Sequence, residues 1–568
     1  MRNLKSKIIF LWIFCMFVPQ AVTQSVYVPL QHWAYDYIER LETKGVITGA
    51  LNGTRPFSRE EFTRYLMQVD EKVRAGYHLT NVEQQQLDFL HFEFKEEFEL
   101  LSGHNGVHYQ SNIEKLKHSK TFGKLFPGFL YKNNRNLFHL DKDAFRVNFD
   151  PVFYHDWLYA GADSLSGAER VLERAHGLTL WGQLGTHVGF YFDFRDTKQW
   201  GTRTYPRQFD ISLPGLGFVN GYGTHIWHDE TVAYVVFKLP YFQLIVGKDR
   251  NYWGPGFNSA LGLSDNATSY DQIKLQSKFW RLKFTWLWGF LRTFPAILDE
   301  AGRAREKNLI AHRLEVDVAR WLNLGLYEAV IFSNRRFELA YVNPINFYRS
   351  AEHALGDDDN VSMGLDFELL LIPNVKLYGE LFIDDLFTSR LGSGYFGNKT
   401  AYLAGAYWVD AFAMPNLDAR MEYVRTRPFV YTHKTGINAY SHFSTGLGHW
   451  IGPNADDWLF HLRYRLSKSW LISMQVEFYR HGANEPENNV GGDFRRARAS
   501  GDADIVPFLS GIEERRKRLA FNIRYEIFRN FFVGVDLNTA SSENMLLPDG
   551  QRGGVGRREV LFGVSLNR

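Results

Sequence analysis

The sequence predicts an all-β transmembrane barrel of about 18 antiparallel strands, preceded by a small α-helical periplasmic segment. Three observations lead to this fold. Apolar and polar residues alternate from about residue 140 to the end, the connections between these stretches are strongly unequal in length, and the chain holds 47 Phe, 29 Tyr and 15 Trp. Outer-membrane barrels combine alternating strands, short periplasmic turns, long extracellular loops and aromatic girdles.

The first residues have the pattern of an export signal. Arg2, Lys5 and Lys7 precede an apolar run over residues 8–18, and small residues follow near Ala21. We therefore expect residues 1–24 to be a signal peptide. No later stretch offers about 18 uninterrupted apolar residues, which excludes a helical membrane protein.

Composition removes several classes of function. Cys15 is the single cysteine and lies in the predicted signal, so the mature chain is expected to lack disulfides, thiol nucleophiles and Cys-ligated metals. Loss of the signal removes three of 65 basic residues and none of 63 acidic ones, which leaves a net charge near −1. This balance does not predict nucleic-acid binding. We expect no cofactor and no bound metal.

Residues 25–105 are predicted to form a helical periplasmic or plug segment. Ser58 with Glu61 and Thr80 with Glu83 have the spacing of helix N-terminal capping boxes. Leu87, Leu90, Phe94, Phe98 and Leu101 then form one apolar stripe at helical spacing. Residues 106–139 are expected to be a linker, and residues 140–568 the barrel.

The strand pattern is regular and its connections decide the architecture. Phe145, Val147 and Phe149 alternate with polar residues, as do the odd-numbered residues of 519–527. Tight turns are predicted near residues 239–240, 319–323, 372–374, 467–469 and 529–530, whereas the other connections are long and polar. A soluble β-sandwich would share the alternation, but the unequal connections favour the barrel.

Two stretches resemble one family. Residues 247–266 read GKDRNYWGPGFNSALGLSDN, and a second stretch, which ends at Asp366, contains GLYEAVIF and FELAYVNPINFYRSAEHALGDDDNVSMGLD. In the order and spacing of these motifs the chain resembles the Wzi family of outer-membrane capsule assembly proteins. The resemblance implies a barrel of about 18 strands, with helices at its periplasmic mouth, that helps to anchor capsular polysaccharide as a lectin-like receptor.

A further motif lies in the helical segment. Residues 32–49, HWAYDYIERLETKGVITG, followed by FSREEF, resemble a single S-layer-homology motif, which binds cell-wall polymers in other proteins. Two roles remain open for it, a structural plug or periplasmic contact and a cell-wall contact. We favour the first.

The candidate glycan-binding residues lie in two long connections, which are expected on the extracellular side or folded back into the lumen. Sugars stack on aromatic rings while charged and amide groups take their hydroxyls. The candidates are Arg250, Tyr252, Trp253, Asn343, Asn346, Tyr348, Arg349 and Asp357. For Arg250, Tyr252 and Trp253 the alternative is an interfacial aromatic belt with a rigid Gly-Pro-Gly turn.

Two charged runs have open interpretations. Asp357, Asp358, Asp359 and Asn360 could bind Ca²⁺ through oxygen ligands, but their spacing differs from that of an EF-hand, and a solvated or strand-capping run is favoured. A basic run flanks a predicted external loop and could meet lipopolysaccharide phosphates or remain solvated. Its residues are Arg495, Arg496, Arg498, Arg515, Arg516, Lys517 and Arg518.

The favoured function is non-enzymatic binding of capsular or extracellular polysaccharide at the cell outer membrane. A porin or specific transport channel is the alternative. A hydrolase is less favoured because the sequence has neither a G-x-S-x-G nor an H-E-x-x-H motif. Expected partners are the polysaccharide, outer-membrane lipid including lipopolysaccharide, and a periplasmic or cell-wall contact through the helices, with no nucleic acid.

Overall fold

The computed structural model describes most of the chain. The described ranges are residues 26–102, 111–119, 129–161, 167–202, 215–222, 224–293, 296–298, 302, 304–546 and 551–567. The predicted signal peptide therefore lies outside them. Within these ranges, no helix combines the length and apolar character that crossing a membrane requires.

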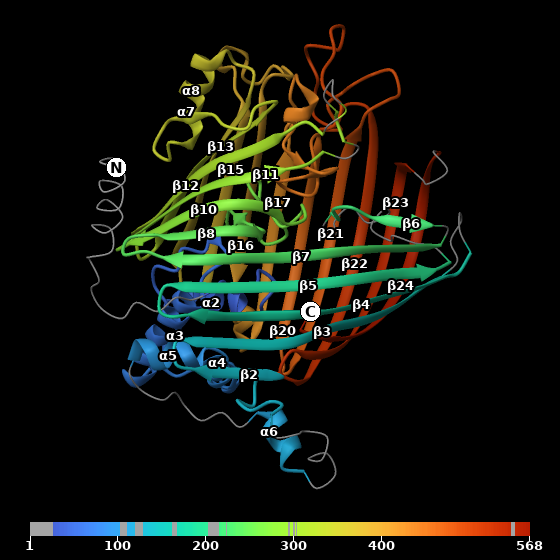
Figure 1. Ribbon diagram of the computed structural model, residues 1–568. Coiled ribbons are helices and arrows are strands. Elements are labelled where there is room, and N and C mark those ends of the chain that lie inside the picture. The colour runs from blue at the N-terminus through green and yellow to red at the C-terminus, as the bar shows by residue number, and fades with distance from the viewer. Residues whose placement is uncertain are drawn as a thin grey trace, which may run out of the picture.

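The described strands close into one antiparallel barrel (Figure 1). Eighteen strands form its wall, which confirms the predicted fold and strand number. The ring closes where β24 pairs with β3, with Leu566 opposite Phe153. The wall strands are β3 (Phe145–Ala160), β4 (Glu169–Leu184), β5 (Val188–Gly201), β7 (His225–Lys238), β8 (Gln243–Asp249), β10 (Tyr270–Phe279), β11 (Leu282–Leu291), β12 (Lys307–Ala319), β13 (Leu322–Ser333), β14 (Asn360–Ile372), β15 (Val375–Asp385), β16 (Lys399–Trp408), β17 (Leu417–Thr426), β20 (Ala455–Arg465), β21 (Trp470–Ala483), β22 (Ile512–Phe528), β23 (Phe531–Leu546) and β24 (Arg552–Leu566).

Short strands extend the wall or lie beside it. The strand β2 (Phe138–Lys142) pairs with the first residues of β3, and β6 (Asn220–Tyr222) pairs with the first residues of β7. Two small sheets are not part of the wall, β1 (Thr54–Arg55) with β9 (Tyr252–Trp253) and β18 (Ser441–His442) with β19 (Thr445–Gly446). The barrel thus begins at Phe138, slightly before the expected residue 140.

The two ends of the barrel differ in their connections, as the sequence predicted. Turns of a few residues join strands at one end, for example between β14 and β15 and between β22 and β23. Asn374 and Asn530 adopt positive φ angles of 61° and 56° in these two turns. Asn tolerates this backbone conformation better than most residues, which explains its place in both turns. The long connections gather at the other end.

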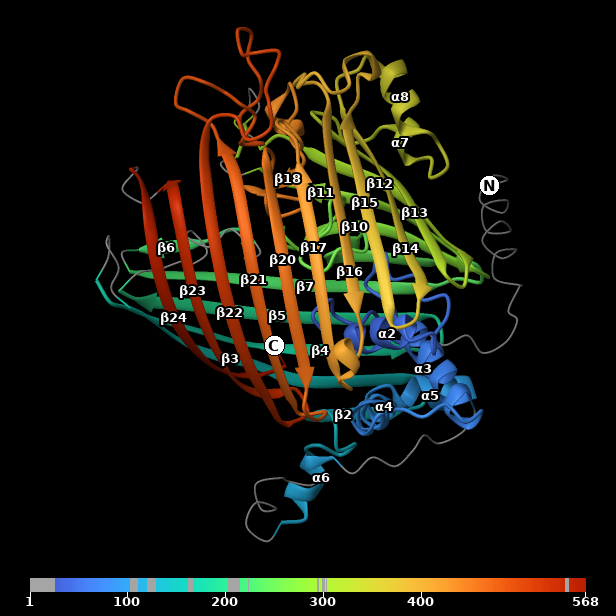
Figure 2. The ribbon, with the colours of Figure 1, turned by 180° about the vertical axis from the view of Figure 1, so that it is seen from behind.

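Four helices pack together at the short-turn end (Figures 1 and 2). They are α2 (Ala34–Thr43), α3 (Arg59–Arg74), α4 (Asn81–Glu93) and α5 (Lys95–Ser102), and α6 (Asn112–Lys117) follows in the stretch expected to be a linker. The Ser58 side chain accepts from the Glu61 backbone N–H, and Thr80 with Glu83 forms a full capping box. The helices share an apolar core that includes Ile38, Leu41, Phe62, Leu66, Leu90 and Phe94.

Ion pairs fasten this helical plug to the inner face of the wall and to the turn between β22 and β23. Glu39 of α2 pairs with Arg420 at 3.0 Å, and Glu93 of α4 pairs with Arg529 at 2.6 Å. Hydrogen-bonded charge pairs stabilise contacts that are shielded from water, because the charged groups retain partners on burial. The plug is therefore docked in the mouth at the short-turn end.

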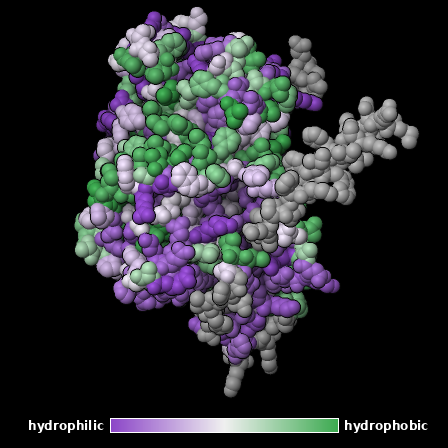
Figure 3. Space-filling view, turned by 90° about the vertical axis from the view of Figure 1, so that its left-hand side faces the viewer, coloured by the Kyte–Doolittle hydropathy of each residue, from purple (hydrophilic) through white to green (hydrophobic). Residues whose placement is uncertain are grey.

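Alternation along each strand separates the two faces of the wall. On β12, Arg313 and Glu315 point inward and contact Thr54 of the plug at 2.8 and 2.6 Å. The residues between and beside them, Leu314 and Val316, therefore point outward. Figure 3 shows hydrophobic side chains gathered across the wall in the upper half of the view, whereas hydrophilic ones predominate below, where the helices lie.

Candidate functional site

One long connection folds into the lumen. We call residues 250–269 the inner loop; it leaves the wall after β8 and returns at β10. Inside the barrel its strand β9 pairs with β1 of the plug, with Trp253 opposite Thr54. Trp253 is only 1 % exposed. The inner loop and the plug therefore meet within the barrel.

Carboxylates on the wall hold the backbone of the inner loop. Glu380 on β15 accepts hydrogen bonds from the backbone N–H groups of Leu261 and Gly262, both at 2.9 Å. Glu422 on β17 does the same for Phe257 at 2.7 Å. A buried loop must find partners for its backbone N–H groups, and these inward carboxylates supply them.

The Gly-Pro-Gly turn needs glycine at both ends because other atoms approach its backbone closely. Gly254 has a φ angle of +134°, and a Cβ atom there would lie 2.5 Å from Oε2 of Glu380. A Cβ atom on Gly256 would lie 1.9 Å from the backbone oxygen of Ser259. Only glycine fits the tight path that brings the loop to Glu380.

Apolar packing fills the half of the lumen beside β10 to β17. Residues 427–454 also fold inward, and Lys307 on β12 donates to the backbone oxygen of Ala439 at 2.7 Å. One continuous core joins this segment, the inner loop and the wall. It includes Trp253, Leu261, Leu309, Tyr327, Leu403, Tyr431, Tyr440 and Leu447.

The other half of the lumen keeps a cavity of about 640 Å³. It lies between the start of the plug and the inner faces of β3 to β8 and β22 to β24. Aromatic, charged and amide side chains line it together. They include Trp181, Tyr191, Tyr234, Phe532, Asp193, Arg195, Glu230, Asp249, Arg250, Asn522 and Arg524.

The cavity lining is ordered by its own contacts. The rings of Tyr191 and Tyr234 stack with centroids 5.3 Å apart, and the Arg524 guanidinium lies 4.9 Å from the centre of the Phe532 ring. Asp193 and Arg195 form an ion pair at 2.7 Å. These contacts fix ring faces and charged groups in a defined arrangement before any ligand arrives.

Some polar atoms in the cavity remain available. Among the described residues, the Nε atom of Arg250 and the Oδ2 atom of Asp249 are buried without a hydrogen-bond partner. Burial lowers the pKa of His32, at the start of the plug, to about 4; Arg529 and Arg59 add to this effect and Glu93 opposes it. His32 is therefore neutral at physiological pH. A polar ligand could form hydrogen bonds with the unpaired atoms of Arg250 and Asp249.

The first three predicted site residues, Arg250, Tyr252 and Trp253, have different roles. Arg250 lines the cavity and pairs with Glu230. Tyr252 and Trp253 are buried, and the Tyr252 hydroxyl donates to the backbone oxygen of Gly256 at 2.7 Å. Neither ring presents a face to a sugar in this arrangement, because both pack inside the inner loop and its surroundings. Their interpretation as stacking platforms is corrected accordingly.

Four of the other five predicted residues, Asn343, Asn346, Tyr348 and Arg349, belong to a loop on the outside of the wall, whereas Asp357 lies beside Lys434 of the segment that folds inward. Residues 334–359, which we call the outer loop, carry α7 (Leu339–Val342) and α8 (Tyr348–Leu355). Tyr348 stacks on His312 with ring centroids 4.3 Å apart, and its hydroxyl accepts from Nε1 of Trp286 at 3.2 Å. His312 adjoins the inward Arg313 and so points outward. The structure therefore places Tyr348 on the opposite face of the wall from Arg250, which lines the luminal cavity.

The remaining outer-loop candidates have local partners. Asn346 donates to the backbone oxygen of Ala340 at 2.7 Å, and the Asn343 side chain accepts from the backbone N–H of Ile345 at 3.3 Å. Arg349 pairs with Glu352 at 3.3 Å. These contacts shape the outer loop itself.

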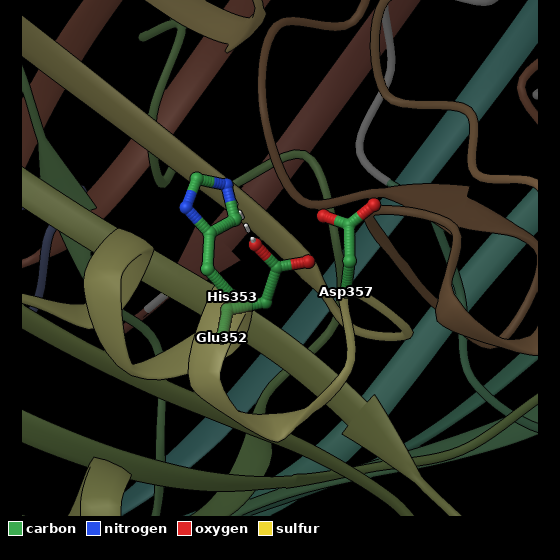
Figure 4. A group of neighbouring side chains, drawn as sticks. All are labelled: Glu352, His353 and Asp357. Carbon is green, nitrogen blue, oxygen red and sulfur yellow. Dashed lines mark ion pairs between the residues drawn. The ribbon is translucent and has the colours of Figure 1, made fainter.

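The acidic run does not act as one ligand set. Asp359 accepts from the Tyr341 hydroxyl at 2.7 Å, whereas Asp357 lies beside Glu352 and His353 (Figure 4), with ligand atoms of these three within 4.8 Å of one another. Burial raises the pKa of Glu352 to about 7, and its hydrogen bond with Asp357 adds to the effect. His353 and Asp357 are exposed, and we assign no ion to this group.

The basic run at the long-loop end is largely paired with neighbouring carboxylates. Arg495 pairs with Asp493 at 2.9 Å, Arg498 with Asp504 at 2.7 Å and Arg515 with Glu513 at 2.8 Å. Pairing lowers the net positive charge that these residues offer to an anionic ligand.

Sequence reasoning missed most of the cavity. Trp181 and Asp193 lie on the neighbouring strands β4 and β5, whereas Arg524 lies on β22, far along the chain, and barrel closure brings it to the same cavity. Each occupies an inward position of an alternating strand, which is the one signal that the sequence held. Alternation predicts an inward position but not which inward positions face an unfilled space.

Comparisons with known proteins agree with the architecture. The family model described as capsule assembly protein Wzi matches residues 230–554. A solved structure of Wzi from Escherichia coli, an outer-membrane protein described as a carbohydrate-binding β-barrel involved in group 1 capsule assembly, is 14 % identical, with 95 % of this chain and 99 % of that chain covered and a TM-score of 0.55. At this identity the likeness shows the fold.

More distant barrels also match. OprD from Pseudomonas aeruginosa is 10 % identical, covering 74 % of this chain and 93 % of its own, with a TM-score of 0.41. OccAB1 from Acinetobacter baumannii is 9 % identical, covering 74 % and 96 %, with a TM-score of 0.42. No curated protein sequence matches, and the comparisons give no support to the S-layer-homology resemblance.

The Wzi family model matches more than half of the length of this chain. This match shows that the outer-membrane chain belongs to the Wzi family of capsule assembly proteins.

Proposed function

We propose that the barrel binds surface polysaccharide in the luminal cavity and thereby assists capsule or exopolysaccharide assembly or attachment, without catalysing a reaction. One observation carries the proposal: aromatic rings, both signs of charge and amide groups converge on a single cavity of about 640 Å³. Ligand sites are typically concave, have volumes of this order and hold a few convergent polar groups.

The chemistry of the lining suits a glycan. Sugar rings place an apolar face on aromatic side chains, and their hydroxyls exchange hydrogen bonds with carboxylates, guanidinium groups and amides. The cavity lining supplies one group of each kind in Trp181, Asp193, Asn522 and Arg524. Family membership supports the same class of ligand, since the Escherichia coli relative is described as carbohydrate-binding.

The filled half of the lumen favours a receptor over a diffusion porin. The core around Trp253 and Tyr431 occupies the space beside β10 to β17, and the plug occupies the short-turn mouth. A porin needs a continuous water-filled path. We therefore expect little conductance from the intact protein in planar bilayers, together with binding of glycan.

Two substitutions test the site. Trp181→Ala and Arg524→Ala should each weaken binding of polysaccharide purified from the cell surface by about 5- to 150-fold, since a lost stacking or charge-assisted contact corresponds to roughly 1 to 3 kcal/mol. The matched controls are Trp227→Ala and Arg515→Ala, at two exposed side chains outside the cavity lining.

Heat-modifiable migration on gels checks that each variant still forms a closed barrel. Binding unchanged in both cavity variants would contradict the luminal site. An equal loss in the controls would show a general effect on the surface instead of a site.

A further inference from the structure

The outward face of the wall carries a polar pair where a lipid-facing surface should be apolar. His312 on β12 and Glu328 on β13 lie 3.2 Å apart. Both point outward, because their neighbours Arg313 and Tyr327 point into the lumen. Polar groups in contact with hydrocarbon are unfavourable unless they are covered and hydrogen-bonded.

The outer loop covers this pair. The Tyr348 ring stacks on His312, and the Tyr348 backbone N–H donates to Oε2 of Glu328 at 3.0 Å. Tyr341 and Tyr348 pack with the outward Ile310, Val330 and Phe332 into one buried cluster. The upper outward face of β11 to β13 is thus shielded by protein.

The outer loop also exposes large apolar side chains of its own. Its exposed fractions are 84 % for Ile345, 70 % for Leu339, 55 % for Phe347 and 54 % for Phe337. Four large apolar side chains exposed together on one loop are unusual for a surface in water and mark an interaction surface. α7 and α8 satisfy much of the backbone of this loop internally, which a lipid environment requires.

The position of the loop identifies what it meets. Below it, outward residues of the same wall remain exposed, among them Leu326, Leu365 and Phe367. A barrel needs an apolar band about 25 Å tall, or about 9–11 residues of tilted strand. On β13 the exposed outward apolar residues end at Leu326, and the loop covers Val330 and Phe332 above it.

We propose that the outer loop completes the lipid-facing band of the barrel, with Phe337, Leu339, Ile345 and Phe347 in contact with acyl chains of the outer leaflet. The loop replaces the wall as the surface that faces lipid and keeps the His312–Glu328 pair away from it. Figures 1 and 2 place α7 and α8 beside the wall strands and away from the plug.

Single-cysteine labelling tests the proposal, since the only natural cysteine is Cys15 in the predicted signal. An environment-sensitive fluorophore is attached at Ile345→Cys in the full protein, in phosphatidylcholine vesicles with or without brominated acyl chains. Leu365→Cys on the wall is the lipid-facing control. Asp358→Cys, at a side chain 84 % exposed in the same loop, is the control for water.

Bromolipid should quench the label at residue 345 as strongly as the label at 365, and aqueous iodide should quench it much less than the label at 358. Equal quenching of 345 and 358 by iodide would overturn the proposal, because the loop would then lie in water. Protection of 345 from both quenchers would also overturn it, since a protein partner would then cover the surface. Glycan binding plays no part in either readout.

Discussion

The inner loop and the outer loop begin as similar sequence features and end on opposite faces of one wall. Both follow a strand, both hold aromatic and amide residues, and both leave the wall at the long-loop end. The inner loop is fastened by carboxylates, of which Glu380 is an example. The outer loop is fastened by aromatic contacts, of which Tyr348 on His312 is an example.

The difference shows that wall register decides where a loop packs. Inward positions of β15 and β17 offer Glu380 and Glu422, which satisfy backbone N–H groups. Outward positions of β11 and β12 carry Trp286, which donates a hydrogen bond through Nε1 to the Tyr348 hydroxyl, and His312, whose ring face stacks on Tyr348. Since neighbouring residues of a strand face opposite sides, a one-residue change of register would exchange these two surfaces.

The largest effect is expected from Glu380→Ala. The substitution leaves three buried donors without their acceptor: the N–H groups of Leu261 and Gly262 and the hydroxyl of Tyr327. At about 1–3 kcal/mol for each unsatisfied group, the free energy of unfolding should fall by roughly 5 kcal/mol. Loss of heat-modifiable migration at a lower temperature measures the change.

Glu380→Gln is the control, because it keeps one acceptor oxygen and should lose less than the alanine variant. Protease cleavage within residues 253–263 should increase in the alanine variant while the outer loop stays protected. Equal stability of the two variants would mean that Glu380 does not hold the inner loop.

The next effect is expected from Tyr348→Ala in the outer loop. Truncation of a fully buried aromatic side chain typically lowers stability by roughly 3–5 kcal/mol. Because the outer loop rests on a completed wall, this loss should free the loop without opening the barrel. Hydrogen exchange of residues 334–359 should rise, and exchange within the inner loop should not.

Tyr348→Phe separates packing from hydrogen bonding, since it removes only the contact with Nε1 of Trp286. Its effect should be about 1 kcal/mol. A phenylalanine variant as destabilised as the alanine variant would assign the stability to the hydroxyl instead of the ring.

The comparison also explains what the sequence could predict. Period-two alternation and unequal connections are local signals, and they predicted the barrel, its strand number and its turns. The helix N-caps at Ser58 and Thr80 are local in the same sense. Features that depend on a few neighbouring residues were therefore accessible.

The candidate site depended on information that the sequence does not hold locally. Trp253 has a ring suited to stacking on a sugar. Glu380, more than a hundred residues away in the chain, holds the inner loop inside the barrel, where Trp253 is buried. Arg250 was predicted and does line the cavity, whereas Trp181 and Arg524 face it only because the ring closes. Which side of a wall a loop packs on is set by such distant partners.

Acid should loosen the plug, and with it the inner loop that pairs with β1, before the outer loop. Burial acts to raise the pKa of Glu61, but Lys278 and Lys283 together hold it down, to about 2. Lys283 also donates to the backbone oxygen of Thr54 in β1, on which the inner loop rests. A lowered pKa gives stability that is present above about pH 4.5 and is lost as the pH falls through about 2.

The loss should reach roughly 3 kcal/mol, at about 1.4 kcal/mol for each pKa unit. Circular dichroism measures this loss as a fall in the melting temperature of the helical plug between pH 5 and pH 2. Glu61→Gln should be less stable at pH 7 and should flatten the profile. A profile that keeps its slope in this variant would assign the acid sensitivity to other carboxylates of the plug.

The smallest effect is expected in the outer loop and has the opposite sign. Burial, with a contribution from Asp357, raises the pKa of Glu352 to about 7, so the folded loop retains a proton that the unfolded loop loses near pH 4.5. This stability is present below about pH 4.5 and disappears as the pH rises through about 7. Because Asp357 is exposed, water screens the interaction, and the change should be only about 1 kcal/mol. Hydrogen exchange of α8, corrected for its intrinsic dependence on pH, should therefore rise between pH 5 and pH 8. Glu352→Gln, which carries no titrating proton, should remove that rise while the acid response of the inner loop persists. An unchanged rise in the glutamine variant would show that Glu352 does not couple the outer loop to pH.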